Sequence, residues 1–174
     1  MRRASVFCVP VLLACGLLTF TVDDDSTTTV PGAGVVGGLL SVLDFTGLDD
    51  FDITIEQEMA DQGVEAGDLE TVDLSVLALH AEPDLSFLSS LDVYVSGEGM
   101  DEILVASGDS FPAGAADVEL TPTHADLTDI VVAGGMAFRV VASGRAPEED
   151  TDLDVHVEVI ITATAQGACS AAKD

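Results

Sequence analysis

The stretch Leu153-Asp154-Val155-His156-Val157-Glu158-Val159-Ile160-Ile161-Thr162 decides the fold. Apolar residues occupy every second position in it, and polar or charged residues fill most of the positions between them. In an extended chain, successive side chains point to opposite faces, so a period of two predicts a strand with one buried face. The apolar positions are mostly Val and Ile, whose branched side chains pack well on a pleated surface. The stretch therefore predicts a long β-strand.

The same alternation recurs toward the N-terminus and predicts six more strands. They cover residues 51–55, 74–79, 91–96, 103–105, 117–121 and 136–141. Residues 84–91 and 125–131 instead show helical spacing, behind the cap candidate Asp84 in one case and Thr123 or Asp126 in the other. Short strands bounded by Gly, Pro and Asp predict an all-β fold. We expect an immunoglobulin-like β-sandwich of about seven strands with one or two short helical turns.

Acidic residues dominate the charge of this chain. It has 32 Asp and Glu against 5 Lys and Arg, and its formal net charge is −27. Such a charge repels nucleic acid and argues against electrostatic docking on anionic lipid. A disordered acidic tail would be poor in apolar residues, but 48% of this chain is hydrophobic. Two interpretations stay open: a solvated surface suited to a salty habitat, or a cation-binding surface.

The N-terminus has the features of an export signal. Arg2 and Arg3 precede the apolar residues 4–14, which have about the length that a signal peptide needs. Residues 12–15, Leu-Leu-Ala-Cys, resemble the lipobox of bacterial lipoproteins. The resemblance implies cleavage before Cys15, acyl chains on Cys15 and, because Gly16 follows, retention in an outer membrane. Ordinary secretion and an uncleaved signal anchor over residues 4–22 are the alternatives, since the apolar character continues to Val22.

Composition divides the chain into four parts. Residues 1–22 are the predicted leader, and residues 23–44 are a predicted polar and Gly-rich tether, because runs of Asp, Ser and Thr bury little surface. The β-sandwich domain is expected over residues 45–166, followed by a flexible tail over residues 167–174. Of the cysteines, Cys8 lies in the leader and Cys169 in the tail, so no disulfide framework is expected inside the domain.

This layout resembles uncharacterised exported bacterial β-sandwich lipoproteins over about residues 45–164, a resemblance that implies no activity. No Gly-x-Ser-x-Gly elbow or phosphate-binding glycine pattern is found in the sequence, so we do not expect an enzyme. We expect a structural or binding lipoprotein of unknown ligand. Its partners would be the membrane, through the lipid or signal anchor, and an unidentified protein or glycan. The expected location is the cell envelope, at the outer membrane or cell surface, with secretion as the alternative.

The best metal-binding candidate is the acidic entry to the longest strand. Asp150, Asp152 and Asp154 stand at alternate positions there. Calcium takes six to eight oxygen ligands, which alternating loop carboxylates can supply, although the EF-hand spacing is not met. A calcium-dependent adhesion or carbohydrate-binding module is therefore the alternative function, and calcium is the one cofactor considered.

The sequence contains two weaker candidate sites. Asp44, Asp49, Asp50 and Asp52 surround Gly47 in a turn that would ordinarily be solvated. His80 and His156 lie in two predicted strands. If those strands were neighbours, the imidazoles could bind a transition metal together with Glu158 or Glu82. The sequence does not say which strands pair.

Overall fold

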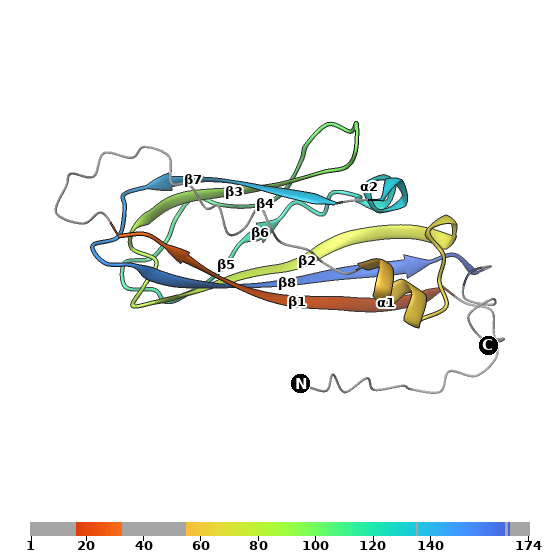
Figure 1. The fold of residues 1–174 in the computed structure, drawn as a ribbon, viewed down its shortest axis with the longest axis horizontal. Coiled ribbons are helices and arrows are strands. Elements are labelled where there is room, and N and C mark those ends of the chain that lie inside the picture. The colour runs from red at the N-terminus through yellow and green to blue at the C-terminus, as the bar shows by residue number, and fades with distance from the viewer. Residues whose placement is uncertain (1–16, 33–54, 135, 166, 168–174) are drawn as a thin grey trace.

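The computed structural model describes residues 17–32, 55–134, 136–165 and 167. Its strands form two antiparallel sheets packed face to face, so the predicted all-β sandwich is confirmed (Figure 1). One sheet has the order β1 (Leu18–Val30), β8 (Thr151–Ala163), β2 (Leu69–Glu82) and β5 (Asp117–Glu119). The other has the order β6 (Thr121–Pro122), β4 (Ile103–Gly108), β3 (Leu88–Ser96) and β7 (Ala137–Gly144). The short helices are α1 (Ile55–Asp61), η1 (Ala66–Asp68) and α2 (Thr128–Ala133).

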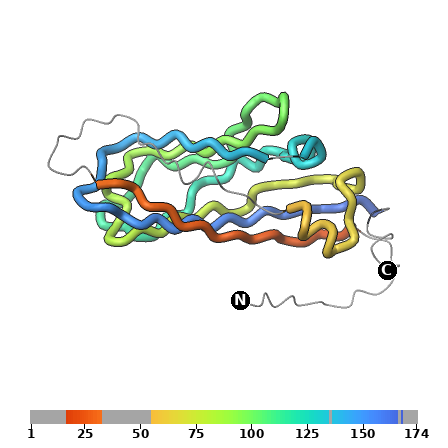
Figure 2. The backbone as a smooth tube through the Cα atoms, in the orientation of Figure 1, coloured from red at the N-terminus to blue at the C-terminus, as the bar shows by residue number. Residues whose placement is uncertain are grey.

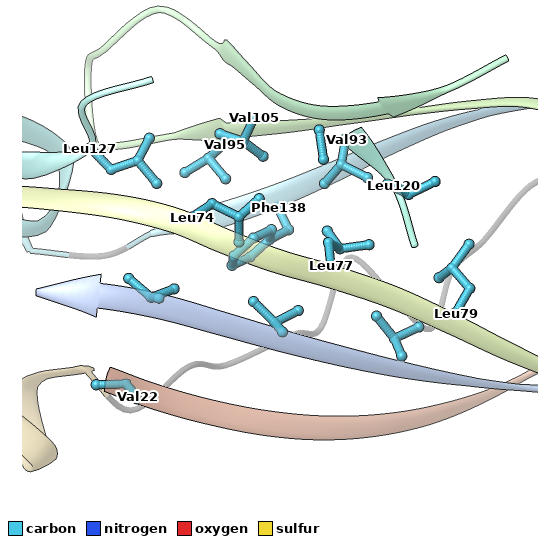
Figure 3. Close-up of a cluster of buried hydrophobic side chains, with 14 of the residues drawn as sticks. Val22, Leu74, Leu77, Leu79, Val93, Val95, Val105, Leu120, Leu127 and Phe138 are labelled. Carbon is cyan, nitrogen blue, oxygen red and sulfur yellow. The ribbon is translucent and has the colours of Figure 1, made fainter. Parts of the chain in front are cut away.

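The core lies between the two sheets. Strand β8 supplies its alternating apolar residues to this core, as its sequence predicts, and it pairs with β2 on one side and β1 on the other. Leu77 and Leu79 of β2 face Val93 of β3 and Phe138 of β7 across the interior (Figure 3). Each Å² of apolar surface that is removed from water in this way stabilises the folded state by about 25 cal/mol.

A β-bulge adjusts strand β2 to this core. The pairing with β8 shifts register between Leu74 and Val76. Because the extra residue resets the alternation, Leu74, Leu77 and Leu79 all point inward and are buried, while Ala78 lies on the outer face. The bulge also fixes which face His80 occupies, since His80 follows the buried Leu79 by one residue.

Strand β1 corrects two predicted boundaries. The Asp-rich and Thr-rich stretch expected to be a tether pairs with β8 at every position from Leu18↔Ala163 to Val30↔Thr151 (Figure 2). Residues 23–30 are therefore part of the sandwich, and so is the end of the predicted leader over residues 18–22. The prediction of a tether is wrong for residues 23–30, because β1 is stabilised by a strand more than a hundred residues away. The sandwich consequently begins at Leu18 and not near Phe45. Residues 33–44 of the predicted tether lie outside the described residues.

Three smaller predictions are also corrected. Residues 84–91 form no helix: Asp84 accepts a hydrogen bond from the Ser86 amide at 2.8 Å in a turn, and β3 begins at Leu88. Residues 117–121 do not form one strand, because β5 pairs with β2 while β6 pairs with β4, and the buried Leu120 lies at the change of sheet. Ile55, predicted at the end of a strand, begins α1.

Other predictions are confirmed or lie outside the described residues. The helix predicted over residues 125–131 is present in part: α2 covers Thr128–Ala133, whereas Asp126 forms an isolated β-bridge with Asp73. Residues 51–54, the acidic turn from Asp44 to Asp52, the lipobox and residues 168–174 lie outside the part of the chain that the structure describes. Within the described part, no helix is both long enough and apolar enough to span a membrane.

Candidate functional site

The pairing of β8 with both of its neighbours brings two histidines to one surface. His156 lies opposite Asp25 of β1 and opposite Ala78 of β2, while His80 lies opposite Asp117 of β5 and opposite Asp154 of β8. All of these side chains point outward, because their strand neighbours Leu79, Val155 and Val157 point into the core. We call this outer surface the histidine face. It consists of Asp25, His80, Asp117, Glu119, Asp154, His156 and Glu158.

Each histidine of this face reaches from an inner strand to a carboxylate on an outer strand. The Nδ1 atom of His156 lies 2.8 Å from an Asp25 carboxylate oxygen, and its Nε2 atom lies 3.4 Å from a Glu158 carboxylate oxygen. The Nδ1 atom of His80 lies 2.7 Å from Asp117. The hydrogen bond to Asp25 raises the pKa of His156 above 6.5, and the bond to Asp117 does the same for the pKa of His80.

A hollow of about 450 Å³ lies between the two histidines. It is lined by Asp25, Ala78, Leu79, His80, Asp117, Val118, Glu119, Asp154, Val155 and His156. The imidazoles do not converge in it, because His156 is turned toward β1 and His80 toward β5. Within residues 17–32, 55–134, 136–165 and 167, no three His, Cys, Asp or Glu side chains form a group that could hold a metal ion. The two histidines of the transition-metal hypothesis thus share a face, but each bonds to its own carboxylate.

The three aspartates of the calcium hypothesis follow one another along the first part of β8 and the residue before it, next to β1. Asp154 accepts a hydrogen bond from the Thr27 hydroxyl at 2.6 Å, and Asp152 accepts one from the Thr29 hydroxyl at 2.8 Å. Asp150 lies just before the strand and accepts a hydrogen bond from the Gly32 amide at 2.8 Å. The three carboxylates therefore fasten β1 and the residues after it to β8, each through a different donor.

A groove of about 910 Å³ lies at the end of the sandwich where β1 ends and β8 begins. It is lined by His80, Ala81, Glu82, Pro83, Asp84, Ser86, Phe87, Ala116, Arg145, Ala146, Pro147, Glu148, Glu149, Asp150 and Thr151. Its carboxylates outnumber its single arginine, so its potential is negative. Loops at the end of a sandwich are positioned by a rigid scaffold and commonly carry binding residues. We call this feature the end groove.

Three further contacts of charged or polar side chains are not predicted from the sequence. On the outer face of the other sheet, Arg139 lies directly opposite Tyr94 and stacks 4.5 Å from the centre of its ring. The Arg139 Nε atom donates a hydrogen bond of 2.7 Å to Glu102. His124 bonds to Asp73 at 3.2 Å. The pairing of Arg139 with Tyr94 depends on the strand register, and the other two contacts depend on where the loops that contain Glu102 and His124 lie.

All three histidines of the chain therefore have carboxylates as their hydrogen-bonded partners. A nucleophilic triad needs a hydroxyl or thiol on the imidazole and a carboxylate behind it. The contacts that the described residues make supply the carboxylate half of this arrangement only. These histidine–carboxylate contacts join neighbouring strands and loops.

Comparison with known proteins gives little more. No protein-family model matches the chain, and no curated protein matches it. Among solved structures, the decameric BFDV capsid protein aligns with 84% of this chain and 99% of its own, at 7% sequence identity and a TM-score of 0.34. A likeness of this strength carries no argument about function.

Proposed function

We propose that this chain is a non-enzymatic, lipid-anchored β-sandwich of the cell envelope, with a structural or binding role and with acyl chains on Cys15. The observation that carries the proposal is the starting point of β1. That strand begins at Leu18, three positions after Cys15. Cleavage before Cys15 would leave every residue of the sandwich on the mature protein.

The two other interpretations of the N-terminus conflict with this strand. Cleavage near Val22, as in ordinary secretion, would remove residues that pair with β8, including Val22 itself, which is buried opposite Val159. An uncleaved membrane span over residues 4–22 would need the same residues inside the bilayer. The lipobox interpretation leaves residues 18–22 in the folded domain, and this supports it over cleavage near Val22 and over a membrane span through residues 4–22.

The arrangement of the two ends supports a binding role. Leu18 and the end groove lie at opposite ends of the long axis of the sandwich, because β1 runs from the first end to the second (Figure 1). A domain anchored at Cys15 would therefore hold the end groove away from the membrane. In this position the groove would be accessible to a protein or glycan partner.

Metabolic labelling with an alkyne analogue of palmitate tests the anchor. We expect label on the wild-type chain, no label on Cys15→Ala, and retained label on the matched control Cys8→Ala, whose cysteine lies inside the leader. Intact mass spectrometry of the mature protein should give the mass of a chain that begins at Cys15 with its acyl groups. A mature chain that begins elsewhere, or label that persists in Cys15→Ala, would contradict the proposal.

A further inference from the structure

The middle of β1 is polar on both of its faces. Between the buried Val22 and Val30, the strand contains only Asp, Ser and Thr. Its inward-pointing residues here, Asp24, Ser26 and Thr28, are half-buried. This part of β1 therefore adds no hydrophobic side chain to the core. It is held by backbone pairing with β8 and by three side-chain contacts between the strands: Asp25 with His156, Thr27 with Asp154, and Thr29 with Asp152.

Charge works against this pairing unless a cation is present. Asp23 lies directly opposite Glu158, and like charges at directly opposite positions destabilise a pair of strands. The next outward residue of β1, Asp25, lies opposite His156. His156 is thus placed among three carboxylates, and it is the only residue of this group that can carry a positive charge.

The geometry of His156 fits the charged imidazole. Its two ring nitrogens each face a carboxylate oxygen, at 2.8 Å for Asp25 and 3.4 Å for Glu158. A carboxylate only accepts hydrogen bonds, and a neutral imidazole has a single N–H to donate. The protonated ring has two, so only this form can donate to both strands' carboxylates at once.

We propose that His156 is a proton-operated latch that holds the polar middle of β1 against β8. When the ring is protonated, it bridges Asp25 and Glu158 and offsets the repulsion between Glu158 and Asp23. When the ring loses its proton, one of the two bonds is lost and the repulsion remains. The resulting change is local, since Val22 and Val30 are buried at the two ends of the segment. Opening would uncover the edge of β8 near His156.

The sign of the pH dependence follows from the environment of the ring. The hydrogen bond to Asp25 raises the pKa of His156 above 6.5. Burial of the ring opposes this rise, by less than Asp25 contributes, and Glu158 adds a further, smaller rise. A raised folded-state pKa means that the stabilisation is fully present below about pH 6.5 and is lost as the pH rises through the raised value. The other charged groups around the hollow are Asp154, His80, Asp117 and Glu119. Of these, His80 bonds to Asp117 on β5 and makes no such bridge to β1.

Hydrogen exchange of the full chain tests the latch, with each amide expressed as a protection factor relative to its intrinsic rate. Between about pH 5.5 and about pH 8, we expect the protected amides of residues 23–29 to lose protection about two- to fivefold, the factor typical of one exposed ion pair. In His156→Gln this pH dependence should disappear. In the matched control His80→Gln it should persist, because His80 bridges β2 and β5. The β8 amides that bond to β2 serve as the internal reference for global changes.

Equal pH dependence of residues 23–29 in wild type and His156→Gln would overturn the proposal. Nuclear magnetic resonance titration of the imidazoles gives a second readout that does not depend on strand opening. Asp25→Asn should lower the pKa of His156 toward its ordinary value and leave the pKa of His80 where it is. An unchanged pKa of His156 in Asp25→Asn would also overturn the proposal.

Discussion

Strands β1 and β8 are each 13 residues long and pair with each other over their whole length, yet their sequences have little in common. Strand β8 places apolar residues at its inward positions from Leu153 to Ile161, and these are buried. Strand β1 does so only near its ends, and its middle is polar on both faces. The difference teaches that β8 is specified by its own residues, whereas the middle of β1 is specified by the partner beside it.

The largest expected effect concerns how much the inward side chains of each strand contribute to the core. Ile161→Ala in β8 removes a fully buried side chain and should lower the free energy of unfolding by about 2–5 kcal/mol. Ser26→Ala, at an inward position in the middle of β1, should change it by less than about 0.5 kcal/mol. Urea denaturation at one fixed salt concentration measures both. Similar losses in the two variants would mean that the middle of β1 contributes to the core after all.

This contrast also shows how much of the fold the sequence can predict. Strand β8 can be predicted from the sequence, because its alternation is a local property of the chain. Strand β1 cannot be predicted in this way, because its partners are far away in the sequence. Asp25 bonds to His156, and Thr27 bonds to Asp154. The split of residues 117–121 into two sheets at Leu120 was equally hidden, since a change of sheet leaves the alternation intact.

For the candidate site, the sequence supplied the residues but not their arrangement. His80 and His156 were recognised as candidates, and their common face follows only from the register of β2 with β8, which a β-bulge in β2 shifts. Asp150, Asp152 and Asp154 were recognised from their spacing. That spacing could not reveal that Gly32, Thr29 and Thr27 would each donate a hydrogen bond to one of them.

Salt should strengthen the whole fold, and the polar strand most. The chain carries a formal charge of −27, and raising sodium chloride from about 0.1 M to about 1 M shortens the Debye length from about 10 Å to about 3 Å. Weaker self-repulsion should raise the Tm by several degrees, which corresponds to an increase of roughly 1 kcal/mol or more in the free energy of unfolding. Potassium chloride should act equally if the effect is screening. A Tm that is constant across this range would contradict the expectation.

The cross-strand hydroxyls should have a smaller effect that is confined to β1. The double variant Thr27→Val/Thr29→Val removes the donors to Asp154 and Asp152. A hydrogen bond typically contributes about 0.5–1.5 kcal/mol to the free energy of unfolding, and we expect less than this for each of these two because they are exposed to solvent. Thr21→Val is the matched control, because Thr21 lies opposite Ile160, where an added apolar contact should be neutral or slightly stabilising. Urea denaturation measures the difference, and equal stabilities of the two variants would contradict it.

Calcium should have the smallest effect, and it separates the two roles considered for Asp150, Asp152 and Asp154. If these carboxylates mainly fasten β1 to β8, millimolar calcium should raise the Tm no more than magnesium at the same ionic strength, since each carboxylate already accepts a bond from a different donor. Asp152→Asn/Asp154→Asn should then change the Tm by the same amount with and without calcium. A calcium-specific rise that this double variant abolishes would instead establish the calcium site, and with it the adhesion or carbohydrate-binding alternative.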